Sequence, residues 1–248
     1  MASEHPPASE RVRREWRDRV VAEYRSAAIT QHLTLWMTQA GLSPDLLREG
    51  LRIAEDELEH SKLSNDVYLA AGGRAQPELD RATLGLPEPP DEPLEHRLVA
   101  SVVRIFCLGE TIAVPLFRHL RERCTVDVSR RALDRILADE GRHRAFGWDT
   151  LDLLIEVFGL DIVRDVVEPR LGAMLEGLDA SYGSGAIARD RGTTTDADRA
   201  WGVVPAAEFA TIFASTVDAV WVPRFSRLGI TVDLSWSTEH RGSSSLPR

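Results

Sequence analysis

The chain has 248 residues, 43% of them hydrophobic and 28% charged, which is enough apolar material to bury a sizeable core. Aromatic residues make up only 6%, and Arg, Glu, Asp and Ala dominate the polar segments, so the composition favours helices over strands. The formal net charge of −9 argues against nucleic acid or an anionic membrane as the main partner, because either would require a basic surface.

The N-terminal segment MASEHPPASERVRREW has no apolar stretch of the kind found in signal peptides. A run of about eighteen apolar residues, the length of a membrane span, is absent from the sequence as well. The two cysteines, Cys107 and Cys124, are too few for a disulfide scaffold or a four-thiolate metal site. We therefore expect a cytoplasmic, mostly helical protein without a membrane partner.

The first half of the chain predicts a short tail and two long helices. Residues 1–8 are expected to be disordered, and Ser9 is expected to cap a first helix that ends at Gly41. A second helix is expected over residues 43–73, because it opens with Ser-Pro-Asp and closes with Gly-Gly. Residues 74–93 contain several prolines and little helical periodicity, which predicts a long connection.

Two further helices complete the predicted bundle. The third runs over about residues 92–122, and the fourth starts at Asp127 or Ser129 and ends near Gly159. The connections inside each pair are short and the one between the pairs is long. Residues 9–159 are therefore predicted to form an all-α four-helix bundle with one long crossover.

The remaining residues predict a helical extension. A fifth helix is expected to be interrupted around Pro169, and the polar residues 183–200 are expected to form a mobile loop. A last helix covers about residues 205–228. We expect residues 160–237 to pack on the bundle as two or so extra helices, followed by a disordered tail over residues 238–248.

A weak internal repeat links the second and fourth predicted helices. Residues 53–60 (IAEDELEH) and 136–143 (ILADEGRH) share the pattern I-x-x-D-E-x-x-H. A Glu and a His three residues apart lie on one helix face, within reach of one metal ion. A single E-x-x-H has little specificity, but these two occur at corresponding points of two helical hairpins. Their placement therefore favours a shared role.

Each motif is preceded, one helix earlier, by a Glu on a face of apolar or small residues: Glu23 and Glu110. An unpaired carboxylate on a buried face is costly. The sequence separations are similar, 34 residues from Glu23 to Glu57 and 30 from Glu110 to Glu140, so antiparallel helices would bring each Glu level with its motif. Four carboxylates and two imidazoles then converge, and four negative charges would balance two divalent cations.

The ordered set of six residues resembles the signature of the ferritin-like di-iron carboxylate superfamily, which reads Glu, E-x-x-H, Glu, E-x-x-H on four helices. The resemblance covers roughly residues 10–158. It implies a ferritin-like bundle that binds two iron ions, with manganese as an alternative at one or both positions, and O₂ as co-substrate. The implied metal ligands are Glu23, Glu57, His60, Glu110, Glu140 and His143.

By this resemblance, Glu57 and Glu140 bridge the two ions, and the other four residues bind one ion each. Asp56 and Asp139 lie four residues before the two histidines. Carboxylates in such places commonly hold the second nitrogen of a metal-binding imidazole. We expect that role for both, either within one helix or across the bundle.

Space for a substrate is predicted beside the metals. Pro115 follows Glu110 by five residues and removes a backbone hydrogen bond, which predicts a kink or bulge, although an ordinary tolerated kink is the alternative. Gly147, one turn after His143, either makes room for a ligand or lets two helices approach. The expected lining is Ala27, Thr30, Phe106, Ala113, Phe117 and Gly147.

Several functions are compatible with this ligand set, because the fold does not fix the reaction. The favoured hypothesis is a di-iron oxidoreductase, an oxygenase or oxidase that acts on a small, partly apolar organic substrate and takes electrons from an external reductase. The alternative is a ferroxidase or iron-handling protein without an organic substrate. A third hypothesis is a bundle with one structural metal, or a partner-binding module. The sequence leaves a homodimer open.

Overall fold

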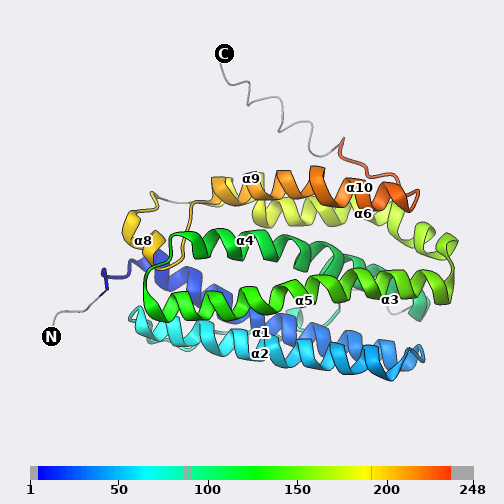
Figure 1. Ribbon diagram of the computed structural model, residues 1–248, viewed down its shortest axis with the longest axis horizontal. Coiled ribbons are helices and arrows are strands. Elements are labelled where there is room, and N and C mark those ends of the chain that lie inside the picture. Colours follow the sequence, from blue (N-terminus) through cyan, green and yellow to red (C-terminus); the bar gives the residue numbers. More distant parts are fainter. Residues whose placement is uncertain (1–4, 87–88, 90, 191, 236–248) are drawn as a thin grey trace, which may run out of the picture.

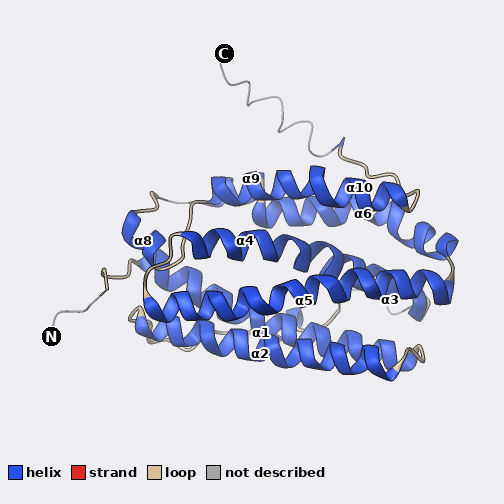
Figure 2. Cartoon of the chain, viewed as in Figure 1, coloured by secondary structure: helices blue, strands red, loops and turns tan. Residues whose placement is uncertain are grey.

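Every regular element in the described part of the chain is a helix (Figure 2). The computed structural model describes residues 5–86, 89, 91–190 and 192–235. Within these residues no β-strand occurs. The prediction of an all-α protein is therefore confirmed for this part of the chain.

The first two helices begin where their capping residues predict. α1 spans Glu10–Gln39, and the side chain of Ser9 accepts a hydrogen bond from the backbone of the first turn. α2 spans Pro44–Ala70 and is capped by Ser43 in the same way. Gly41, with a φ of 71°, makes the turn between them, where a side chain would be strained. The two helices pack together along their length as an antiparallel pair.

The third long helix is continuous from Leu94 to Glu122 but changes its winding in the middle. It consists of α3 (Leu94–Val102), the π-helical segment η2 (Val103–Glu110) and α4 (Thr111–Glu122). The expected bulge is thus present, but it lies before Pro115 and ends at Glu110. A π segment leaves backbone groups in need of other partners, and the indole N–H of Trp221 donates to the carbonyl of Cys107 at 3.0 Å.

The long connection and the fourth helix follow the prediction closely. Residues 71–93 join α2 to α3, and their described part contains one short 3₁₀ helix, η1 (Arg81–Thr83). α3 begins two residues later than expected, after Pro93. α5 spans Asp127–Phe158 and starts at the first of the two predicted positions.

The C-terminal residues form a second layer, on the side of the third helix away from α1 and α2 (Figure 1). α6 (Leu160–Tyr182) packs against α3 and α5, and α9 (Ala206–Thr216) packs against α4. A π segment, η3 (Val217–Trp221), joins α9 to α10 (Val222–Arg227). The extension therefore covers the irregular third helix.

Two expectations about this extension were wrong. α6 continues through Pro169 without a break. Residues 183–200 contain two short helices, α7 (Ser184–Arg189) and α8 (Asp196–Ala200), where a loop was expected. Asp198 forms a capping box at the start of α8 and accepts a hydrogen bond from Ser9. This hydrogen bond attaches α8 to the start of α1.

Part of the predicted N-terminal tail is attached to α8. The indole of Trp201 donates to the carbonyl of Pro6 at 2.9 Å, and the indole of Trp16 donates to the carbonyl of Trp201 at 2.9 Å. The expected disorder of residues 1–4 and of the C-terminal tail lies outside the described residues.

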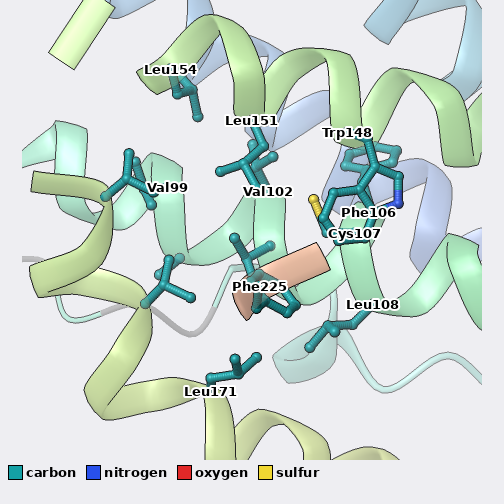
Figure 3. Packing of buried hydrophobic residues seen from close by; sticks show 14 of the residues in the cluster. Val99, Val102, Phe106, Cys107, Leu108, Trp148, Leu151, Leu154, Leu171 and Phe225 are labelled. Atoms are coloured by element: carbon teal, nitrogen blue, oxygen red, sulfur yellow. The ribbon is translucent and has the colours of Figure 1, made fainter. Parts of the chain in front are cut away.

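Two hydrophobic clusters lie toward opposite ends of the bundle. The larger one gathers side chains from the third helix, α5, α6 and α10, among them Phe106, Leu151 and Phe225 (Figure 3). The smaller one includes Val12 and Trp16. Along α1, α2 and α5, buried polar residues separate the two clusters.

One helix among the described residues, Leu94–Glu122, is long and apolar enough to cross a membrane by length and composition alone. Most of it is buried within the protein, as expected of a core helix in a bundle.

Candidate metal centre

The six predicted ligands meet in the polar middle of the bundle. α1 contributes one carboxylate, α2 and α5 contribute a carboxylate and an imidazole each, and the last residue of η2 contributes the fourth carboxylate. None of these side chains is more than 8% exposed. They are Glu23, Glu57, His60, Glu110, Glu140 and His143.

These side chains form two overlapping groups, in each of which the candidate ligand atoms all lie within 4.8 Å of one another. The first group is Glu23, Glu57, His60 and Glu140, and the second is Glu57, Glu110, Glu140 and His143. The carboxylates of Glu57 and Glu140 belong to both groups. The geometry could therefore hold metal, with two carboxylates placed to be shared between neighbouring ions.

Each histidine presents Nδ1 to the centre and Nε2 to an aspartate of the opposite helix. Nε2 of His60 lies 3.0 Å from a carboxylate oxygen of Asp139, and Nε2 of His143 lies 3.3 Å from one of Asp56. The two predicted aspartates thus act across the bundle, between α2 and α5. Such contacts fix the orientation of an imidazole and leave its other nitrogen available to a metal.

Several buried atoms of the centre have no hydrogen-bond partner among the described residues. They are Nδ1 of His60 and His143 and one oxygen each of Glu57 and Glu140. Buried polar atoms of this kind are costly unless something satisfies them. All four atoms belong to residues of the two ligand groups, so bound metal ions fit the donor set that this chain provides.

Two arginines that the sequence analysis missed neutralise the aspartates. Nε of Arg135 donates to Asp139 at 2.6 Å, and its Nη2 donates to Asp56 at 3.2 Å. Arg142 donates to Asp56 and lies 3.5 Å from Asp139. Their spacings of four and three residues from Asp139 on one helix are the signal that could have found them. Because two guanidinium groups balance the two aspartates, the four glutamates, once deprotonated, would carry a charge equal to that of two divalent cations.

Burial shifts the protonation of the centre. It raises the pKa of Glu23, Glu57 and Glu140 well above the ordinary range, and repulsion between neighbouring carboxylates adds to the effect. Burial likewise lowers the pKa of His60 to about 4. Burial also opposes ionisation of Asp139, but hydrogen bonds from Arg135 and His60 outweigh it and lower its pKa. The imidazole of His60 is therefore neutral at pH 7, as a metal ligand must be.

A cavity of about 480 Å³ reaches the four carboxylates from one side. It lies between α1 and the third helix, and its walls are largely apolar. The wall residues are Ala22, Ile29, Ile105, Gly109, Ala113, Leu116, Phe117, Leu120 and Phe209, and the polar lining is Glu15, Asp18, Arg19, Arg25, Ser26 and Tyr182. Its volume is within the range of small-molecule sites, roughly 300–1,000 Å³.

Only part of the predicted pocket lines this cavity. Ala113 and Phe117 do, whereas the structure places Ala27, Thr30, Phe106 and Gly147 in packed regions. A Cβ atom added to Gly147 would lie 2.5 Å from the Cβ of Phe106, so this glycine lets α5 approach η2 closely. Of the two roles predicted for Gly147, the structure therefore agrees with the close approach of two helices.

No motif or periodicity in the sequence marks three of the cavity residues, Arg19, Tyr182 and Phe209. The guanidinium of Arg19 lies over the ring of Trp16, 4.2 Å from its centroid. Tyr182 and Phe209 come from the C-terminal extension, whose relation to the bundle no motif predicts. Burial, with the charges of nearby glutamates, raises the pKa of Tyr182 to about 12, so its phenol is protonated at pH 7.

Comparisons of the chain with protein-family models, with curated proteins and with solved structures find no match.

Proposed function

We propose that the protein is a ferritin-like di-iron oxidoreductase, an oxygenase or oxidase that uses O₂ to oxidise a small, partly apolar organic substrate. The observation that carries the proposal is the pair of overlapping, fully buried ligand groups beside an apolar cavity. Two iron ions, or manganese at one or both positions, would supply the Lewis acidity and the redox equivalents for this chemistry.

The chain's own residues would prepare the site in three ways. Glu57 and Glu140 would hold the two ions together, while Glu23 with His60 and Glu110 with His143 would complete one ion each. The Asp–Arg layer between α2 and α5 would keep both imidazoles oriented. The apolar wall would hold the substrate next to the centre and exclude water, since activated oxygen reacts with what lies beside it.

A ferroxidase is the second candidate, because the same cavity also carries acidic side chains away from the centre. Glu15 and Asp18 line it and could guide Fe(II) inward. However, each lies beside a neighbouring arginine, Glu15 at 3.6 Å from Arg14 and Asp18 at 2.8 Å from Arg17. The apolar side chains, which expose more surface to the cavity than the polar ones do, favour the organic substrate. Repeated turnover would then require an external reductase.

The test is anaerobic loading with Fe(II), metal analysis, and exposure to O₂ with optical spectroscopy. The proposal predicts about two ions per chain and, without a reductant, oxidation that stops after those two ions. A ferroxidase would continue to oxidise each further addition of Fe(II). Uptake of a single ion without any reaction with O₂ would instead indicate one structural metal, and it would overturn the di-iron proposal.

A further inference from the structure

Arg19 is a cation in the cavity that forms no ion pair with a described residue. It lies on α1 one turn before Glu23, and its guanidinium is held over the rings of Trp16 and Phe117, at 4.2 and 5.4 Å from their centroids. Its Nη1 atom is fully buried and makes no hydrogen bond to any described residue. Nor does any described carboxylate form an ion pair with it. Arg19 as a whole is half-buried, but a guanidinium stays charged, so the burial of Nη1 without a hydrogen bond is costly unless an anion completes the site.

The carboxylates nearest to Arg19 are committed elsewhere. Glu23 belongs to the proposed metal centre, where an ion would take up its charge. Glu15 and Asp18 lie beside Arg14 and Arg17, respectively. Two cations line the cavity, Arg19 and the exposed Arg25, and of these only Arg19 has a buried nitrogen without a hydrogen bond to a described residue. With the metal centre loaded, Arg19 would therefore be the positive charge that most needs an anion.

Tyr182 adds a hydrogen-bond donor to the same place. Its side chain lines the same cavity as Arg19, from the end of α6. Its protonated phenol can donate a hydrogen bond, and no hydrogen bond of this hydroxyl to a described residue is present in the structure. A cationic fork and a phenol donor beside the apolar side chains of the cavity are a donor set for a carboxylate.

We propose that the cavity binds an amphipathic carboxylate, with its anionic end at Arg19 and Tyr182 and its hydrocarbon part against the apolar wall. This proposal deepens the proposed function, on which it rests, by naming the substrate class. Arg19 precedes Glu23 by four residues, a rise of roughly 6 Å along α1. A carbon a few bonds from the carboxylate would therefore lie beside the metal centre.

The apolar wall suits such a molecule. Ile29 and Ile105 face the cavity from α1 and η2, and Leu116 and Phe117 face it from α4. Burying a hydrocarbon chain there contributes about 0.8 kcal/mol for each CH₂ group. Binding should therefore need both ends of the ligand, the anion for Arg19 and the chain for the wall.

The experiment measures binding of octanoate by calorimetry to protein loaded anaerobically with Mn(II). Wild type should bind octanoate more tightly than octan-1-ol or acetate. Arg19→Gln should weaken octanoate binding by roughly 10- to 100-fold, the range for a lost hydrogen bond to a charged group, with little effect on octan-1-ol. Tyr182→Phe should weaken octanoate by a smaller factor.

The matched control is Arg48→Gln, which removes the same charge from an exposed residue of α2 that does not line this cavity. It should leave octanoate binding unchanged. Equal octanoate affinity in wild type and Arg19→Gln, with equal metal content, would overturn the proposal, because the carboxylate would then bind elsewhere, for example at the metals. If Arg19→Gln does not fold, Tyr182→Phe decides in the same way.

The measurement also separates this proposal from the proposed function. Metal content is determined before each titration. A wild-type chain that fails to take up Mn(II) counts against the metal centre, whereas Arg19-independent binding in a fully loaded chain counts against the carboxylate site alone.

Discussion

The two sides of the candidate metal centre are built differently. On the side of α2 and α5, aspartates, arginines and histidines interlock across the helices at hydrogen-bond distance. On the side of α1 and the third helix, the carboxylates border a cavity with largely apolar walls. The first side is polar and filled, and the second is apolar and open.

This difference indicates that the two sides have different roles, one in holding the metal ligands and the other in accepting a substrate. A filled polar layer can fix the ligands and their charge, because every group in it has a partner. An open apolar wall can accept molecules of varied shape without disturbing that layer. The irregular winding of η2, which ends at Glu110, lies on the open side, where a bulge most easily changes the space beside the centre.

The largest expected effect comes from removing a shared ligand. Glu57→Ala should bring metal content well below two ions per chain and toward zero, because this carboxylate belongs to both ligand groups. Glu23→Ala, on the open side, removes a ligand from one group only and should leave about one ion. Metal analysis after anaerobic loading measures both.

Glu59→Ala is the control, since this residue on α2, whose side chain is 44% exposed, belongs to neither group. It should bind the same amount of metal as wild type. If Glu23→Ala and Glu57→Ala lose metal equally, the shared position of Glu57 has no functional meaning and the distinction between bridging and terminal ligands fails.

A smaller effect is expected from the filled side. Asp139→Asn retains the shape of the side chain but removes the negative charge with which His60 and Arg135 form hydrogen bonds. Metal affinity should fall by roughly 10- to 100-fold, the usual range for such partners. Competition with a chelator measures it.

Asp134→Asn on the same helix, at an exposed residue paired with Arg121, provides the comparison. It should change metal affinity little. Organic ligand binding on the open side should also survive Asp139→Asn once metal is saturating. An unchanged affinity for metal in Asp139→Asn would contradict this prediction. It would mean that the layer of Asp56, Asp139 and the two arginines stabilises the bundle without supporting metal binding.

The filled side was largely predictable from the sequence and the open side was not. The I-x-x-D-E-x-x-H repeat places an acid and an imidazole on one helix face, so spacing alone indicated which groups would meet. The repeat also placed Asp56 and Asp139 beside the centre. It did not predict that each aspartate contacts the histidine of the opposite helix. The positions of Arg135 and Arg142 beside the two aspartates were not predicted, because charged residues on a helix are usually solvated.

The open side depends on contacts between distant segments. Whether a small residue such as Gly147 lines a cavity or allows close packing is decided by the helix opposite it, and Phe106 fills that space. Tyr182 and Phe209 reach the cavity only because the extension folds back over the third helix, which no local pattern encodes. Periodicity likewise located the helix around Glu110 but not the π segment that precedes it.

The smallest expected effect concerns the attachment of that extension. Glu208 on α9 accepts hydrogen bonds from Arg199 at 2.5 Å and lies 2.5 Å from His119 on α4, next to the cavity residue Phe209. The hydrogen bond from Arg199 is the main cause that lowers the pKa of Glu208 to about 2; burial opposes it and His119 adds to it. About a third of the carboxylate side chain is exposed, so solvent screens these interactions.

Glu208→Gln should therefore lower the free energy of unfolding by about 1 kcal/mol at pH 7. Because folding lowers the pKa of this group, its contribution is fully present above about pH 4.5 and disappears as the pH falls through about 2. Denaturant unfolding should show the variant and wild type converging over that range. Glu122→Gln, which removes the other carboxylate beside His119 at a side chain that is 58% exposed, should cost less. Metal content should stay at the wild-type level in both variants; a loss of metal in Glu208→Gln would show that the open side also supports the ligands and that the two sides are not independent.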